Sequence, residues 1–293
     1  MGVVWESRDR ALIADAVPRV MGIVNVTPDS FSDGGRWPEA DAAVEHGLKL
    51  VEKEADILDV GGESTRPGAD VVPVAEEIRR VVPVIERLAA TGRPISIDTM
   101  KPEVAREALA AGACIINDVS GLRDEAMAKL AVDAGAAVVV MHMQGSPQTM
   151  QDDPSYEDVV GEVFEYLAGR VRWCESMGIS RSRVAVDPGI GFGKTYEHNL
   201  LLLRNLHRFA TLDCALLLGV SRKGLLKTIT GKGMAQRLTS SVVASLVGCT
   251  LGANIVRVHD VGPMVDAIRV WKEIRGWGSD DGYRDGIGDR NSG

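Results

Sequence analysis

The sequence has no excess of basic residues, because 33 Lys and Arg stand against 41 Asp and Glu, a formal net charge of −8. Binding to nucleic acid or to an anionic membrane usually needs a basic face, so we expect neither as a partner. It also has no apolar run near the roughly 18 residues that indicate a membrane span, and CALLLGV at 214–220 has the length of a buried strand. We therefore expect a soluble protein whose partners are small molecules.

Signals for metal, disulfide and export chemistry are also absent. The four cysteines show no CxxC or Cys/His ligand spacing, and they are Cys114, Cys174, Cys214 and Cys249. We assign them no disulfide or metal chemistry. Residues 1–19 have no apolar core or cleavage site of a secretory signal, so the expected location is the cytoplasm. FGKT at 192–195 is no phosphate loop, because Pro188 stands where that motif needs its first glycine.

The chain between about Val20 and Arg275 repeats one unit, a short β-branched apolar run followed by a polar loop and a stretch of helical periodicity. Eight such runs occur, at 20–26, 56–61, 94–98, 114–118, 136–142, 183–187, 215–220 and 254–259. Apolar strands that alternate with helices indicate a parallel sheet covered on both faces. The pattern predicts an α/β fold, a single-domain TIM (β/α)8 barrel at 20–275. An N-terminal lead segment at 1–19 precedes it, and a Gly- and Asp-rich tail at 276–293, expected to be flexible, follows it.

The predicted strands end in polar residues, although their interiors are mostly Val, Ile and Leu. In a barrel of this kind the C-terminal strand ends meet at one mouth, where ligands bind. The polar ends are Asn25, Gly61-Gly62-Glu63, Asp98, Asn117, His142, Asp187, Ser221 with Lys223, and Arg257 with His259. Any single one could instead cap the next helix or turn, but eight together predict a pocket.

Three of these ends, Asp98, Asn117 and Asp187, carry hydrogen-bond acceptors. Buried acceptors must be matched by donors, so this set suits a flat heterocycle that displays several N–H groups. Lys223 could bond a ring oxygen or nitrogen and balance the two aspartates, or it could simply be an exposed lysine of the next helix.

A second group of polar ends indicates an anion site opposite the acceptors. Arg257 and His259 lie two residues apart, so a strand directs both side chains to one face, and Asn25 lies on the neighbouring first strand. Together they suit a phosphate or diphosphate. Ser221 precedes the next helical stretch, where backbone N–H groups favour an anion such as a carboxylate, although it could equally be a plain helix cap.

Two loops after the first and second strands are unusually long, TPDSFSDGGRWP at 27–38 and GGESTRPGADVVP at 61–73. Long loops at a barrel mouth commonly carry lids and substrate contacts. The candidate contact residues in these two loops are Phe31, Ser32, Asp33, Thr65, Arg66 and Pro67.

Eight motifs follow one another over nearly all of 20–275. They are MGIVNVTPDSFSDGG (21–35), DVGGESTRPG (59–68), SIDT (96–99), INDVSG (116–121), VMHMQGSPQTMQ (140–151), DPGIGFGKT (187–195), GVSRK (219–223) and IVRVHDV (255–261). In these motifs and their order the sequence resembles the dihydropteroate synthase family, the pterin-binding enzymes that join 6-hydroxymethyl-7,8-dihydropterin diphosphate to p-aminobenzoate.

The resemblance implies a role for each matched residue. The pterin would be held by residues at Asp98, Asn117, Met141, Asp187, Phe192, Gly219 and Lys223. The diphosphate would lie at Asn25, Arg257 and His259, with Asn25 helping to hold Mg2+, and the aminobenzoate at Phe31, Thr65, Arg66, Pro67 and Ser221, with Ser32 and Asp33 in the lid. The catalytic groups would be Asp98, Lys223, Arg257, His259 and Asn25. The implied mechanism is dissociative, since diphosphate leaves before the aniline nitrogen attacks a pterin-methylene cation.

The resemblance also implies a sulfonamide target and a homodimer packed through the last barrel helices. The small, apolar segment 239–253 could serve that contact or lie buried against the barrel. Gly224-Leu225 stands where relatives often carry a bulky residue, which leaves the outer wall of the aminobenzoate site and sulfonamide binding open. Glu54 also departs from the usual small residue, far from the mouth.

Three other functions remain open from the sequence. A pterin-binding methyltransferase would need neither the SRK segment nor the two long loops, and both are present. A paralogue that binds pterins without catalysis would more naturally have lost Asn25, Lys223, Arg257 or His259, and all four are retained. An unrelated phosphate-binding barrel would not explain the three-acceptor set.

Overall fold

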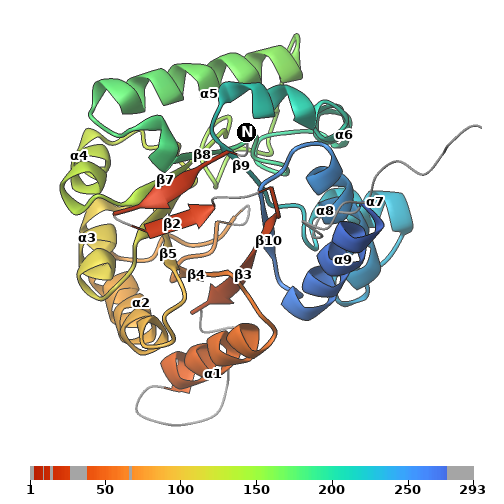
Figure 1. Cartoon of the computed structure of the whole chain (residues 1–293). Coiled ribbons are helices and arrows are strands. Elements are labelled where there is room, and N and C mark those ends of the chain that lie inside the picture. Colours follow the sequence, from red (N-terminus) through yellow and green to blue (C-terminus); the bar gives the residue numbers. More distant parts are fainter. Residues whose placement is uncertain (1–2, 9, 14–15, 27–37, 66–67, 276–293) are drawn as a thin grey trace, which may run out of the picture.

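The computed structural model describes residues 3–8, 10–13, 16–26, 38–65 and 68–275. Within them eight parallel strands close into a barrel in the order β10-β3-β4-β5-β6-β7-β8-β9, which confirms the predicted architecture (Figure 1). The strands are β3 (Arg19–Asn25), β4 (Ile57–Gly61), β5 (Ile95–Asp98), β6 (Ile115–Asp118), β7 (Ala137–Met141), β8 (Val184–Asp187), β9 (Ala215–Leu218) and β10 (Ile255–Val258). Each lies within or close to a run predicted from the sequence.

Helices surround the barrel and cover the outer face of the sheet (Figure 1). They are α1 (Pro38–Glu52), α2 (Val74–Ala89), α3 (Pro102–Ala110), α4 (Glu125–Ala134), α5 (Val159–Ser176), α6 (Tyr196–Arg204), α7 (Gly224–Thr230), α8 (Leu238–Thr250) and α9 (Val261–Ile274). Their apolar faces and the outward side chains of the strands form one large buried cluster. Among the described residues no helix is both long and apolar enough to cross a membrane.

The register of the strands places their polar ends at one level. Asn25 pairs with Gly61, Gly61 with Asp98, and Asp98 with Asn117 across three successive strand pairs. On the other side of the barrel Met141 pairs with Asp187. Because parallel pairing in register brings these Cα atoms side by side, the side chains that follow the apolar interiors share one mouth.

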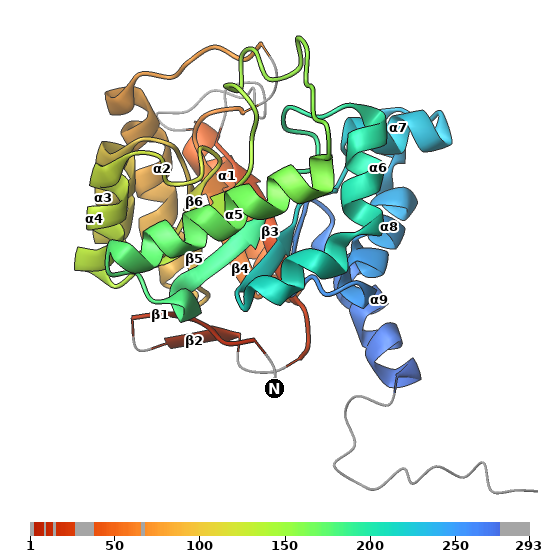
Figure 2. The same ribbon diagram turned by 90° about the horizontal axis from the view of Figure 1, so that it is seen from above.

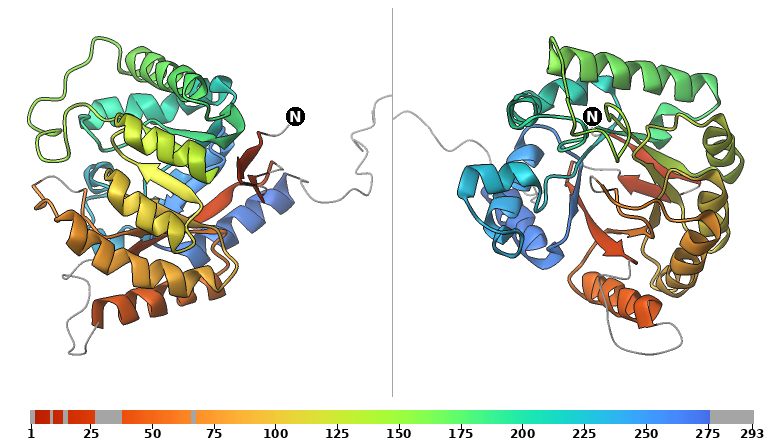
Figure 3. Two further views of the ribbon diagram at one scale, coloured as in Figure 1. Left: turned by 90° about the vertical axis from the view of Figure 1, so that its left-hand side faces the viewer. Right: turned by 180° about the vertical axis from the view of Figure 1, so that it is seen from behind.

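The lead segment forms an antiparallel hairpin that the sequence analysis does not predict, with strands β1 (Trp5–Ser7) and β2 (Arg10–Ile13). Trp5 and Ile13 are buried in a cluster with inward residues of the barrel such as Met21 and Ile115. Figure 2 shows the hairpin across one end of the barrel, and Figure 3 (right) views the opposite end, where the loops after the strands gather. The hairpin therefore closes the bottom of the barrel and leaves the mouth for function.

Candidate active site

A cavity of about 820 Å³ opens at the C-terminal ends of the strands. Twelve of the predicted site residues line it, namely Asn25, Thr65, Asp98, Asn117, Met141, Asp187, Phe192, Gly219, Ser221, Lys223, Arg257 and His259. The expectation that His142 shares this pocket is wrong, because His142 is buried behind the lining residue Lys194. The other predicted site residues, Phe31, Ser32, Asp33, Arg66 and Pro67, lie outside the described residues. A cavity of this size is typical of a site for small molecules.

The centre of the site is an ion-pair network around Arg257. Its Nε donates to Asp59 Oδ2 at 2.6 Å and its Nη2 to Asp98 Oδ2 at 2.7 Å. Asn117 Nδ2 also donates to Asp59 Oδ2, at 3.2 Å. Arg257 therefore lies beside the acceptor Asp98 and not apart from it, because its side chain bonds both Asp98 and Asp59. Its contact with a diphosphate stays a prediction.

Asp59 is a central residue that the sequence analysis missed. It lies inside β4 and is fully buried, so the run DILDVG was read as an ordinary apolar strand. The signal was present, since a lone aspartate inside a buried strand must find a partner. Asp59 and Asp98 each keep one buried oxygen, Oδ1, without a hydrogen-bond partner in the described part of the chain.

The carboxyl groups of Asp98 and Asp187 have raised pKa values. Burial raises the pKa of Asp98 to about 7, with the charge of Arg257 opposing the shift and Asp59 adding to it. Burial likewise raises the pKa of Asp187, while the charge of Lys223 opposes that shift. Buried carboxyls with unused acceptor oxygens are suited to a ligand that brings N–H donors.

An apolar wall faces these acceptors. Met141 and Met150 pack with Val119 in a small buried cluster, against which Phe192 lies. Lys223 Nζ lies 4.6 Å from the centroid of the Phe192 ring and donates to the carbonyl of Ile190. Burial lowers the pKa of Lys223 to about 8, although the charge of Asp187 opposes the shift. The alternative of an exposed helical lysine is wrong, since Lys223 faces the pocket.

The loop after β8 is held close to the loop after β7. Gly189 has φ +70°, and a Cβ atom there would lie 1.9 Å from the carbonyl oxygen of His142, so only glycine fits. Lys194 Nζ lies 3.0 Å from His142 Nδ1 and donates to the Phe192 carbonyl at 2.9 Å. Lys194 is buried and lines the cavity, and its burial lowers its pKa to about 7. The sequence analysis assigned it no role.

Ser221 and His259 meet at the far side of the mouth. The Ser221 Oγ lies 3.0 Å from His259 Nδ1, and it accepts from the His259 backbone N–H at 3.3 Å. The alternative of a plain helix cap at Ser221 is wrong, because α7 begins at Gly224 with Lys223 at its cap position. Arg237, which the sequence analysis also missed, lines the cavity and donates to the Arg222 carbonyl at 2.7 Å.

Comparison with known proteins identifies the family. Residues 21–259 match the family model described as pterin binding enzyme. The chain belongs to the pterin-binding enzyme family. Dihydropteroate synthase of Escherichia coli (strain K12) is 46% identical over 254 residues, which cover 86% of this chain and 90% of the relative.

Solved structures of the pterin-binding family agree. Dihydropteroate synthase of Xanthomonas albilineans with 4-aminobenzoic acid is 50% identical and superposes with a TM-score of 0.85. The match covers 91% of this chain and 95% of the solved chain. The same organism's enzyme in complex with 7,8-dihydropteroate is 46% identical and gives a TM-score of 0.84. This match covers 93% of this chain and 98% of the solved chain. The pterin-binding barrel of this chain is therefore shared along nearly its whole length.

Proposed function

We propose that this chain is a dihydropteroate synthase, a transferase that condenses 6-hydroxymethyl-7,8-dihydropterin diphosphate with p-aminobenzoate to give 7,8-dihydropteroate and diphosphate. The observation that carries the proposal is the cavity, in which buried acceptors at Asp98, Asn117 and Asp187 face the apolar wall at Met141 and Phe192. Relatives of this name at 46% identity over most of the chain support the same reaction.

The pterin fits the part of the cavity where donors are lacking. Its amino group and ring N–H groups would satisfy the free Oδ1 of Asp98, and its flat face would lie on Phe192 and the methionines. Lys223 Nζ, which is close to the Phe192 ring, would bond a ring acceptor. The diphosphate would then extend toward Asn25, Arg257 and His259. The aminobenzoate would extend toward Thr65 and Ser221.

The mechanism that we propose is dissociative. The C–O bond between the pterin methylene and the diphosphate breaks first, and the electron pair leaves with the diphosphate oxygen. Asp98 stabilises the positive charge on the pterin methylene, and the cationic groups at the mouth stabilise the leaving anion. The aniline nitrogen then forms the new C–N bond and releases one proton. No protein nucleophile is needed, because substrate binding brings the two reacting atoms together.

Mg2+ fits the residues at the diphosphate end. Asn25 ends β3 with its side chain exposed at the cavity, and an amide oxygen is a ligand that Mg2+ accepts. No group of three or more His, Cys, Asp or Glu residues with metal-site geometry occurs among the described residues, so most ligands would be phosphate oxygens and water. When bound, the ion would neutralise charge on the leaving diphosphate.

The test is a steady-state assay of the purified protein with the pterin diphosphate, radiolabelled p-aminobenzoate and Mg2+. We expect labelled dihydropteroate only when all three are present. Omission of each component and addition of EDTA are the controls. If no product forms while calorimetry detects pterin diphosphate binding, the chain is a binding paralogue, and if neither is observed the pterin assignment fails.

We also propose a homodimer in the cytoplasm, assembled through α7, α8 and α9. Helix α8 buries Ser245 and Gly248 against the barrel but leaves Val243 56% and Val247 51% exposed, and Val270 of α9 is 60% exposed. Neighbouring exposed apolar side chains favour a protein interface. Light scattering should give twice the chain mass, and V243E/V247E should give monomers. A monomeric parent at micromolar concentration would contradict the proposal.

A further inference from the structure

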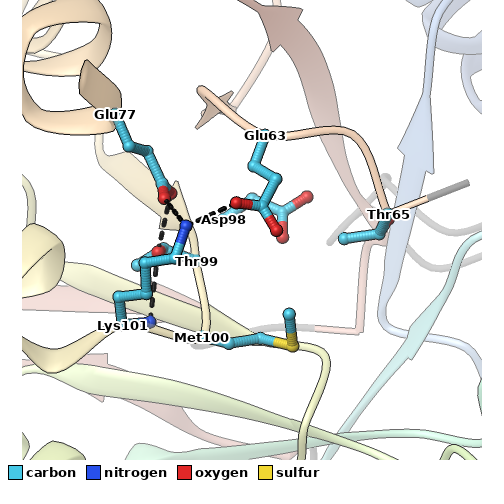
Figure 4. A pocket seen from close by; sticks show the side chains of 7 residues that line it. All are labelled: Glu63, Thr65, Glu77, Asp98, Thr99, Met100 and Lys101. Carbon is cyan, nitrogen blue, oxygen red and sulfur yellow. Dashed lines mark hydrogen bonds and ion pairs between the residues drawn. The ribbon is translucent and has the colours of Figure 1, made fainter. Parts of the chain in front are cut away.

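A partly buried lysine, three residues after Asp98, holds two glutamates together (Figure 4). Lys101 Nζ donates to Glu63 Oε2, to Glu77 Oε2 at 2.6 Å and to the backbone carbonyl of Val72 at 2.6 Å. All three N–H donors of the ammonium group are thus used. The side chains of Lys101, Glu63 and Glu77 are 19%, 10% and 1% exposed, so this is a largely buried network and not a surface ion pair.

The network joins the two ends of one loop. Glu63 follows β4 and Val72 lies just before α2, nine residues later, and Glu63 Oε2 also accepts the Val72 backbone N–H at 2.9 Å. Glu77 is held a second time by the same segment, because Thr99 Oγ1 donates to its Oε1 at 2.8 Å. One ammonium group, contributed by the segment between β5 and α3, therefore fixes where the β4–α2 loop starts and where it ends.

The start of the loop has no room to shift toward α2. A Cβ atom at Gly62 would lie 2.7 Å from Val81 Cγ1 and 3.0 Å from Glu77 Cγ, so the backbone already touches the helix. Arg80 Nη1 donates to the Gly62 carbonyl at 3.0 Å. Glycine packing holds the loop from one side, and the lysine network holds it from the other.

The network borders the substrate cavity. Glu63 and Thr65 line both the main cavity and a small one of about 10 Å³ that lies between them and Lys101 (Figure 4). Thr65 is two residues after Glu63 and belongs to the wall proposed above for the aminobenzoate. A change in the position of Glu63 must therefore alter this wall first, whereas the pterin acceptors Asn117 and Asp187 lie on other strands. The third acceptor, Asp98, also lines the small cavity, but Arg257 Nη2 holds its carboxylate at 2.7 Å independently of Lys101.

We propose that Lys101 is a positioning residue for the second substrate: by tying Glu63 to Val72 and Glu77, it sets the β4–α2 loop so that Thr65 presents the aminobenzoate wall. This role rests on the proposed function and extends it, because it concerns the binding of the second substrate and not the binding of the pterin. Lys101 does not touch the reacting atoms. Its loss should weaken aminobenzoate binding while leaving pterin binding unchanged.

The test compares K101M with the parent protein. We expect KM for p-aminobenzoate to rise about tenfold, which is about 1.4 kcal/mol, because the charge-assisted hydrogen bonds that hold the loop are lost. The Kd of the pterin diphosphate, from calorimetry, should stay within about twofold, and kcat should change less than KM. K101R keeps the charge and should recover most of the lost affinity. K129M removes a matched lysine from an exposed pair with Glu125 and should change nothing.

Several outcomes would overturn the proposal. An unchanged KM for p-aminobenzoate in folded K101M would do so, as would a parallel loss of pterin diphosphate binding, which would show a general structural role. If K101M does not fold, E63Q takes its place, since it keeps the shape but weakens the pair with Lys101, and an unaltered KM there rejects the idea. Failure of the proposed function itself is distinguishable, because the parent protein would then form no dihydropteroate.

Discussion

Replacement of Arg257 by alanine tests the centre of the site most directly. The guanidinium bonds Asp59 at 2.6 Å and Asp98 at 2.7 Å, and Asp59 is completely buried. Loss of one partner of a buried ion pair costs about 3–5 kcal/mol of folding free energy, because the remaining charge has no compensation. The sequence alone predicts a purely catalytic loss for this variant, whereas the structure adds a loss of stability.

The catalytic loss should be of similar size. Removal of one preorganised charged group typically costs roughly 3–4 kcal/mol of transition-state stabilisation, a hundredfold to thousandfold in rate. Thermal unfolding should show a fall in the midpoint of at least about 6 °C, given roughly 2–4 °C per kcal/mol for a chain of this size. Steady-state kinetics with saturating Mg2+ measures the rate, and calorimetry of unfolding measures the stability.

A second substitution separates the two effects. Adding D59N to R257A removes one uncompensated carboxylate, so stability should recover in part while turnover stays low. R257A with near-normal turnover would refute the catalytic role. R257A as stable as the parent, with no gain on adding D59N, would refute the reading of Asp59 and Asp98 as charges held by one guanidinium.

Three further variants test other parts of the molecule. K223A should lose a hundredfold to thousandfold in kcat, roughly 3–4 kcal/mol. It should still unfold at the parent's temperature, because burial disfavours the charged lysine and lowers its pKa to about 8, so removing the ammonium group also removes that cost. A large loss of stability would contradict this expectation. In the parent, the folded-state pKa of Asp98 is raised to about 7, so its stability contribution should be lost as pH rises from about 4 through 7. Denaturant unfolding of D98N should lack that slope, and an unchanged slope would exclude Asp98. W5A should lose about 3–5 kcal/mol of stability, because Trp5 is fully buried at the end of the barrel remote from the mouth. The KM for both substrates should stay constant, and altered KM values would link the hairpin to the site.

The barrel could be predicted because its signal is repeated. Each strand shows an apolar run and a polar end. Parallel pairing in register then places Asp98 beside Asn117, so this neighbourhood can be predicted before any side-chain contact is known. The hairpin β1–β2 could not be predicted, because its strands have three and four residues and carry charged side chains such as Glu6 and Arg10. Its formation depends on the apolar bottom of the barrel, which a local pattern does not reveal.

The polar contacts across the barrel were also beyond the sequence. Period-two geometry correctly directs Arg257 into the mouth, but its side chain is long enough to reach several partners, and the choice of Asp59 depends on the distance across the closed sheet. Lys101 has the same property, since it reaches Glu63 and Glu77 from a different βα unit. Residues whose long side chains contact distant elements are thus harder to predict than residues whose role follows from the position of their backbone alone.

The two charge networks, one around Arg257 and one around Lys101, have different roles. Arg257 fixes Asp59 and Asp98 through their Oδ2 atoms and leaves both Oδ1 atoms without partners among the described residues. Asp98 lines the cavity, so a donor group on a ligand that bonds its Oδ1 lowers the free energy of that region. Lys101 satisfies its own three donors completely and has none left for a ligand. An incompletely satisfied network is suited to recognition, whereas a completely satisfied one is suited to holding shape. This difference in hydrogen-bond satisfaction is why we assign binding and charge stabilisation to the first network and positioning of the loop to the second.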